Sequence, residues 1–185
     1  IAAPAEILGL ETIAEAMAHP LIRQYLRKVA LEEIVPHVAA VPGITSSQYL
    51  ALVERRFANP EIHDTVRRVA FDGSSRQTGA VLPTIREAVK AGMPVEGLAL
   101  SQAFWMRMCC GIREDGTTIE PNDPVWDRLV RAARSARSQP LFWLEQRSFY
   151  GDLADCAAFA EAFTAASHQI NRTGVAEAID AYLRT

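Results

Sequence analysis

The sequence lacks the short motifs that mark nucleotide-binding and hydrolytic sites. No Gly-x-Gly-x-x-Gly segment follows a strand-like run, and neither a P-loop nor a Gly-x-Ser-x-Gly elbow occurs. His-Glu-x-x-His is also missing, and the histidines lie far apart along the chain. We expect them to cap helices or face solvent rather than to catalyse or bind a metal; they are His19, His37, His63 and His168. The chain alone therefore shows no nucleotide-binding fingerprint and predicts no metal site.

Cysteine is scarce, and its spacing does not suit a structural zinc site. The three cysteines, Cys109, Cys110 and Cys156, cannot all pair with one another, and no Cys-x-x-Cys spacing occurs. Cys109 and Cys110 are adjacent within an apolar run. We therefore expect small buried thiols in a reducing environment, which predicts a cytoplasmic protein.

The chain has neither a strong net charge nor a long apolar run. Its net charge is −3, and the arginines are scattered among acidic residues. This pattern argues against nucleic acid or an anionic membrane as a partner. No apolar run approaches the roughly 18 residues needed to cross a bilayer, and no charged leader precedes an apolar stretch at the N-terminus.

The length of 185 residues predicts one domain, over residues 1–185, with its own hydrophobic core. The first residue is Ile1 rather than an initiator methionine. Methionine is not normally removed from in front of a bulky isoleucine, so we expect the chain to be a fragment or an excised domain.

Most of the sequence shows the apolar periodicity of α-helices. Apolar residues recur at steps of three and four, and no sustained strand alternation is present. Ser46 or Ser47 is the expected N-cap of the second long helix, and Asn59 with Pro60 is expected to open the third. The sequence thus predicts an all-α fold, a multi-helix bundle. The expected helices cover residues 20–36, 47–57, 60–70, 84–91, 97–110, 124–137, 154–171 and 173–183.

The helix expected over residues 97–110 is apolar nearly all round, which is typical of a helix in the middle of a bundle. We interpret Trp105, Met106 and Met108 as core residues rather than as part of a cofactor site. Arg107 interrupts this run, and a buried guanidinium would need a carboxylate or carbonyl partner. Structural pairing is the favoured interpretation of Arg107.

The segment Phe-Asp-Gly-Ser-Ser-Arg-Gln-Thr-Gly-Ala-Val-Leu-Pro, residues 71–83, interrupts the helical pattern. It is either a plain loop or half of a substrate site. Arg67 and Arg68 precede it on the polar side of their expected helix, and Arg76 lies within it, where Asp72 or a serine could cap a short turn. Arg68 and Arg76 would together offer forked donors to a ligand rich in hydroxyls or carrying a carboxylate.

The chain resembles the C-terminal domain of the long-chain mannitol dehydrogenase family over essentially its whole length. The family signature places an arginine eight residues before the basic residue of Asp-Gly-Ser-x-(Lys or Arg). "ILGLETIAEAM" near the start and the later "PNDP" also resemble family segments. The residues that match the signature are Arg56, Phe57, Asn59, Pro60, Arg68 and Arg76.

This resemblance implies the helical half of a two-domain oxidoreductase that interconverts a mannitol-like polyol and its 2-keto sugar. An N-terminal Rossmann-type domain would hold NAD or NADP, and no metal would be needed. The family's catalytic Lys-x-x-x-x-Asn-x-x-His would lie just upstream of Ile1, so this chain alone is expected to be inactive. Arg68 and Arg76 would contact substrate oxygens and position the polyol.

Two departures from the family pattern leave the substrate open. Residue 76 is arginine where lysine is common, and the usual Pro-Lys-Phe after it is replaced by Thr78, Gly79 and Ala80. A fructuronate reductase or another hexuronate oxidoreductase is therefore an alternative. A second alternative, of another class, is a non-catalytic helical interaction module.

Overall fold

The computed structural model describes all residues, 1–185, and contains helices but no strand. The prediction of an all-α fold is confirmed. The α-helices are α1 (Ala2–Ile7), α2 (Ile13–Ala18), α3 (Pro20–Val29), α4 (Ser46–Phe57), α5 (Val66–Ala70), α6 (Gly73–Arg76), α7 (Leu82–Lys90), α8 (Glu96–Met108), α9 (Trp126–Ser135), α10 (Leu141–Leu144), α11 (Arg147–Tyr150), α12 (Ala157–Thr173) and α13 (Val175–Leu183). Two π-helical turns cover Ala30–Ile34 and Gln77–Val81, and 3₁₀ turns cover Val35–His37, Pro60–Ile62 and Gly151–Asp155.

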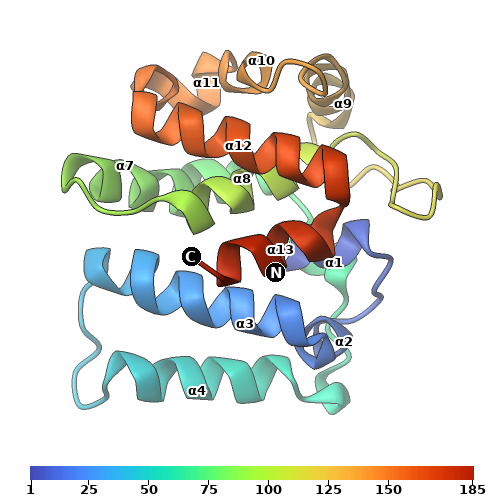
Figure 1. The fold of residues 1–185 in the computed structure, drawn as a ribbon. Helices are drawn as coiled ribbons and strands as arrows, with labels where there is room; N and C mark the ends of the chain where they lie inside the picture. Colours follow the sequence, from blue (N-terminus) through green and yellow to red (C-terminus); the bar gives the residue numbers. More distant parts are fainter.

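Helix α8 is the centre of the bundle. It packs along α12, with α1, α3, α9 and α13 also in contact, so that helices from both ends of the chain surround it (Figure 1). Phe104, Trp105 and Met108 on this helix are almost fully buried, and Met106 is 3% exposed. Burial of such side chains stabilises the fold by about 1.5–3 kcal/mol each. The interpretation of this run as core is confirmed.

The N-terminal end of α8 is held by a buried carboxylate from a distant part of the chain. Glu33, in the first π-helical turn, accepts hydrogen bonds from the backbone N–H groups of Gly97 and Leu98 at 2.7 and 2.8 Å. It also accepts one from the Tyr182 hydroxyl at 2.7 Å. Gly97 has no room for a side chain, because an added Cβ would overlap Tyr182 and Val29. The carboxylate therefore replaces the missing side-chain cap and ties α3, α8 and α13 together.

The helix predicted over residues 60–70 is wrong in its first half. Pro60–Ile62 form a single 3₁₀ turn, His63 adopts a left-handed conformation, and α5 begins only at Val66. Extended backbone pairing replaces the helix, because Asp64 O accepts from Ile13 N at 2.8 Å and Val66 N donates to Glu11 O at 2.9 Å. The preceding helix boundary shifts by one residue as well, since Thr45 rather than Ser46 or Ser47 is the N-cap of α4.

The segment 71–83 is not a plain loop. After Phe71 and Asp72, the chain enters α6, passes through the π-helical turn Gln77–Val81 and continues directly into α7. The backbone leaves the helical conformation at Phe71, which is extended, and at Asp72, which has a positive φ of 57°. The segment thus places Arg76 on a helix, where its direction is fixed by the helical backbone.

The run over residues 97–110 was expected to contain two buried cysteines and an arginine with a structural partner. Cys109 and Cys110 are buried and free, and burial raises the pKa of both thiols. Arg107 is only half-buried, and its guanidinium donates to the Ile112 carbonyl at 2.6 Å. Arg107 thus has the predicted structural partner without being enclosed. No helix combines the length and the apolar character that a bilayer crossing requires.

Candidate functional site

The residues of the family-like signature come together around one cavity. This cavity has a volume of about 320 Å³ and lies between α2, α4 and α5; we call it the Arg68 cavity. The signature residues that line it are Arg56, Phe57, Asn59, Arg68 and Arg76. The structure therefore brings Arg68 and Arg76 to the same cavity, although they belong to different helices, α5 and α6.

Arg68 is fixed on one side of its guanidinium. Its Nε and one terminal nitrogen donate to both carboxylate oxygens of Asp64, each at 2.5 Å. This pairing lowers the pKa of Asp64 below its ordinary value, so the carboxylate stays ionised from mildly acidic pH upward. The second terminal nitrogen of Arg68 has no partner in the protein, and the side chain is 66% exposed. Arg68 is therefore exposed, as its place on the polar side of the expected helix predicts, and its exposed end also lines a cavity.

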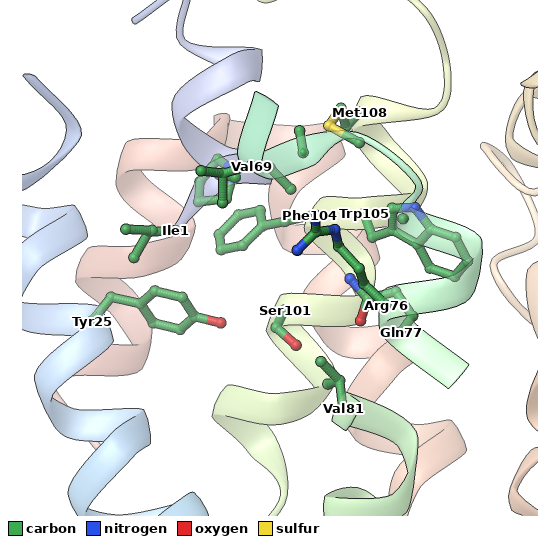
Figure 2. A pocket seen from close by; sticks show the side chains of 15 residues that line it. Ile1, Tyr25, Val69, Arg76, Gln77, Val81, Ser101, Phe104, Trp105 and Met108 are labelled. Atoms are coloured by element: carbon green, nitrogen blue, oxygen red, sulfur yellow. The ribbon is translucent and has the colours of Figure 1, made fainter. Parts of the chain in front are cut away.

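A second cavity, of about 210 Å³, adjoins the first; we call it the Trp105 cavity. Arg76 and Val69 line both cavities. Residues 1–4 form one wall of the Trp105 cavity, and Tyr25, Ser101, Phe104 and Trp105 form much of the rest (Figure 2). Most of the residues that line the Trp105 cavity are apolar, with a few polar groups among them, as is usual for a small-molecule site.

Arg76 is anchored in the same one-sided way as Arg68. Its Nε donates to the Phe71 carbonyl at 2.8 Å, and neither terminal nitrogen has a partner in the protein. In the view of Figure 2 the guanidinium lies between Phe104 and Trp105, which also line the Trp105 cavity. Each arginine therefore keeps unpaired N–H donors beside a cavity while the protein fixes its direction, an arrangement suited to binding ligand oxygens.

The turn that carries Arg76 is held by the later Asn-Asp-Pro segment. Asp123 accepts from the backbone N–H and the hydroxyl of Ser74 at 2.7 and 2.9 Å, and Asp72 N donates to the Asn122 carbonyl at 2.8 Å. Asp72 occupies the N-cap position of α6, but no side chain makes a capping hydrogen bond there, so the expectation that Asp72 or a serine caps this turn is wrong. The sequence analysis missed Asp123; the only signal was that both segments resemble family motifs.

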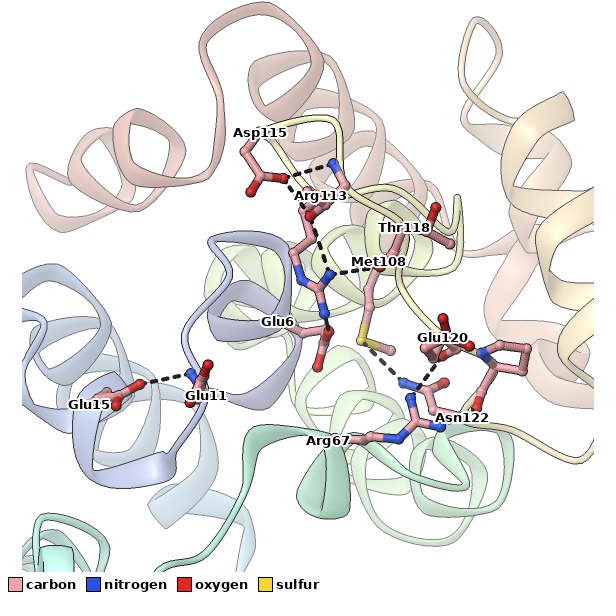
Figure 3. A network of polar contacts seen from close by, with 12 residues as sticks. Glu6, Glu11, Glu15, Arg67, Met108, Arg113, Asp115, Thr118, Glu120 and Asn122 are labelled. Carbon is pink, nitrogen blue, oxygen red and sulfur yellow. Dashed lines mark hydrogen bonds and ion pairs between the residues drawn. The ribbon is translucent and has the colours of Figure 1, made fainter.

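Arg67 reinforces the same connection. Its two terminal nitrogens donate to the carbonyls of Glu120 and Pro121 at 3.1 and 2.7 Å (Figure 3). Close by, Arg113 forms a 2.6 Å ion pair with the buried carboxylate of Glu6. These contacts fix the connection between α8 and α9 against α1 and α5, and the same connection holds the start of α6 through Asn122 and Asp123.

We expect Asp123→Ala to lower the free energy of unfolding by about 1–3 kcal/mol, because the substitution leaves the N–H and hydroxyl of Ser74 without their acceptor. It is also expected to weaken ligand binding, since α6 loses its anchor. Chemical denaturation of the variant measures the first effect. Asp127→Ala, at an exposed position of α9, is the control. An unfolding midpoint equal to that of the control would contradict this role.

Gly73 is required by close packing inside the site. A Cβ at this position would lie 2.7 Å from Trp105 Nε1, and Trp105 is only 1% exposed. The buried indole cannot move away easily, so α6 approaches α8 this closely only with glycine at residue 73.

The side chains that line the two cavities offer hydrogen-bond donors but no general base. Asp64 is the only carboxylate among their lining residues, and it is paired with Arg68. Burial raises the pKa of Tyr25 well above its ordinary value, so its hydroxyl stays protonated. No group of three or more histidine, cysteine, aspartate or glutamate side chains is placed to hold a metal ion. This set of residues can bind and orient a ligand rich in oxygen atoms, and the substrate-contacting roles of Arg68 and Arg76 stay predictions.

Comparison with known proteins places this geometry in context. A mannitol 2-dehydrogenase of Cereibacter sphaeroides is 45% identical over 179 residues, which is 97% of this chain and 37% of that protein. The structure of Pseudomonas fluorescens mannitol 2-dehydrogenase in a ternary complex with NAD and D-mannitol superposes with a TM-score of 0.94. It is 25% identical and covers 100% of this chain, which matches 38% of that one. A substrate-free D-sorbitol dehydrogenase shares the fold, with a TM-score of 0.88 and 24% identity over 97% of this chain and 37% of its own.

The chain spans little more than a third of the length of these relatives. Its matched region is nevertheless continuous, and the family model for the mannitol dehydrogenase C-terminal domain matches residues 1–171. Only the end of α12 and α13 lie beyond the match, and α13 packs on the same core. The chain therefore belongs to the mannitol dehydrogenase C-terminal domain family.

Proposed function

We propose that this chain is the substrate domain of an NAD(P)-dependent oxidoreductase that interconverts a mannitol-like polyol and its 2-keto sugar. The observation that carries the proposal is the pair of half-anchored arginines, Arg68 and Arg76, at two adjoining cavities. Family membership supports it, as does the likeness to a protein whose structure holds NAD and D-mannitol.

The arginines would fix the position of the substrate rather than react with it. Their free N–H groups would donate to hydroxyl or carbonyl oxygens at one end of the substrate. The reacting carbon would then lie toward residues 1–4, which form the opposite wall of the Trp105 cavity. This direction suits a catalytic lysine, asparagine and histidine supplied by sequence that precedes Ile1.

The cofactor does not fit this chain alone. It has no glycine-rich phosphate-binding segment of the kind that holds a dinucleotide. A Rossmann-type domain would therefore bind NAD or NADP, and the cofactor would supply the hydride acceptor for the reaction. The residues of this chain would hold the substrate and exclude water from it.

The full-length protein provides the decisive test. Steady-state oxidation of mannitol, arabinitol and sorbitol with NAD and NADP, together with reduction of fructose and fructuronate, distinguishes the substrate classes. A preference for fructuronate would favour the hexuronate alternative, to which the planar fork of Arg76 is also suited. Inactivity with all of these substrates would favour the non-catalytic interaction module instead.

We expect Arg68→Ala in the full-length protein to lower kcat/KM for the preferred substrate by about tenfold or more, because it removes a charged donor from the substrate site. Initial-rate kinetics measures this. Arg131→Ala, at an exposed position of α9, removes the same charge away from both cavities and is expected to leave kcat/KM unchanged. Equal kinetics for the two variants would remove Arg68 from the site.

A further inference from the structure

A chain of buried hydrogen bonds runs from the core to the Trp105 cavity. Trp143 Nε1 donates to the Tyr150 hydroxyl at 2.6 Å, and that hydroxyl donates to Gln102 Oε1 at 3.0 Å. Gln102 Nε2 then donates to Gln77 Oε1 at 2.7 Å. The side chains of Trp143, Tyr150 and Gln102 belong to residues with no exposed surface.

The order of donors and acceptors along this hydrogen-bond chain is set by the indole of Trp143 at its buried end. An indole N–H can only donate, so the Tyr150 oxygen accepts from Trp143 and its proton points to Gln102. The carbonyl oxygen of Gln102 must then accept the hydrogen bond from Tyr150, and its amide nitrogen donates to Gln77. Burial raises the pKa of Tyr150 well above its ordinary value, so the phenol keeps this proton at any working pH.

The side-chain amide of Gln77, at the end of this hydrogen-bond chain, therefore offers an N–H donor to the Trp105 cavity. Gln77 lines the Trp105 cavity immediately after Arg76, and its carbonyl oxygen is occupied by Gln102 (Figure 2). Its Nε2 has no partner in the protein, while the residue itself is only half-buried. The cavity end of this hydrogen-bond chain is thus an oriented N–H donor, beside Arg76, whose terminal guanidinium nitrogens are unpaired.

We propose that Gln77 is a further substrate-binding residue that donates a hydrogen bond to a substrate oxygen, held in this orientation by Gln102, Tyr150 and Trp143 as positioning residues. The inference rests on the function proposed above. Because the chain fixes the amide, Gln77 donates to a hydroxyl, keto or carboxylate oxygen without having to choose between two orientations, which lowers the entropic cost of binding. A substrate lacking the matching oxygen would leave this donor unpaired and bind less well.

The test compares Gln77→Met with the wild-type full-length protein. Methionine is similar in length and removes the donor, so KM for the preferred polyol or keto sugar is expected to rise by about tenfold or more while kcat changes little. Gln139→Met, at an exposed position outside both cavities, is the matched control and is expected to keep the wild-type KM.

Tyr150→Phe tests the positioning chain separately. It removes the hydroxyl that orders Gln102, and we expect KM to rise about fivefold for the same substrate. A purely structural role would lower the amount of folded enzyme, and with it the apparent kcat, without changing KM. If Tyr150→Phe yields no folded protein, Gln102→Met interrupts the chain one step later and replaces it in the comparison.

The outcomes separate the two proposals. An inactive wild-type protein overturns the proposed function and this inference with it. An active wild-type protein with an unchanged KM in Gln77→Met overturns the role of Gln77 alone. A raised KM in Gln77→Met with an unchanged KM in the positioning variant overturns the role of the buried chain.

Discussion

Glu33→Ala is expected to lower the free energy of unfolding by about 3–5 kcal/mol. The substitution leaves two backbone N–H groups of α8 and the Tyr182 hydroxyl without their acceptor, and all three lie in the core. Each unsatisfied buried donor costs about 1–3 kcal/mol. It also removes a negative charge from the positive end of the central helix. Equilibrium denaturation in urea, with the midpoint and slope compared with wild type, measures the change.

The neighbouring residue gives a matched control. Glu32 is exposed and pairs only with Lys28, one helical turn earlier, so Glu32→Ala is expected to cost about 0.5 kcal/mol or less. Glu33→Gln keeps one acceptor oxygen and should fall between the two. Equal unfolding midpoints for the alanine variants at 32 and 33 would show that α8 does not depend on this carboxylate.

The second large effect concerns activity. Arg76→Ala in the full-length protein is expected to lower kcat/KM by about a hundredfold, more than Arg68→Ala. Arg76 lines both cavities and has both terminal nitrogens free, whereas Arg68 lines one cavity and shares its guanidinium with Asp64. Initial rates with the preferred substrate measure the loss. Circular dichroism checks that α6 and α7 still fold.

Arg76→Lys separates charge from shape. Lysine is common at this position in the family, and it keeps the positive charge but loses the planar fork and the bond to the Phe71 carbonyl. We expect it to recover most of the activity toward a neutral polyol. An Arg76→Ala variant with wild-type kcat/KM would contradict the proposed site, whatever the behaviour of the lysine variant.

The sequence predicted those parts of the fold that depend on local pattern. The central helix α8 was evident from its uniformly apolar run, and the helix expected over residues 84–91 corresponds to α7 (Leu82–Lys90). Arg68 and Arg76 were selected through the family resemblance, and the structure brings them to one cavity. Periodicity alone placed Arg68 on a solvated face, which describes its exposure but not its partner.

What the sequence could not predict depends on contacts between distant residues. The false helix over 60–65 had a favourable start in Asn59 and Pro60, but pairing with residues 11–13 provides better partners for that backbone. Asp123 lies 49 positions from Ser74, so no local rule assigns it as the anchor of α6. Likewise, the role proposed for Gln77 depends on three residues from α8, α10 and α11 that meet only in the folded chain.

The number of residues in the π-helical turn Gln77–Val81 determines how α6 is rotated relative to α7. A wide turn of this kind holds about one residue more than the α-helix it interrupts. Deleting one residue there, such as Gly79, would let the backbone close into a regular helix with α6 still in phase with α7, whereas inserting one more residue would rotate α6 relative to α7 by about 100°. Arg76 would then leave both cavities although no side chain near the substrate had changed. An insertion in this turn would therefore displace Arg76 from the cavities, whereas a point substitution at Gly79, which has open space around it, would not.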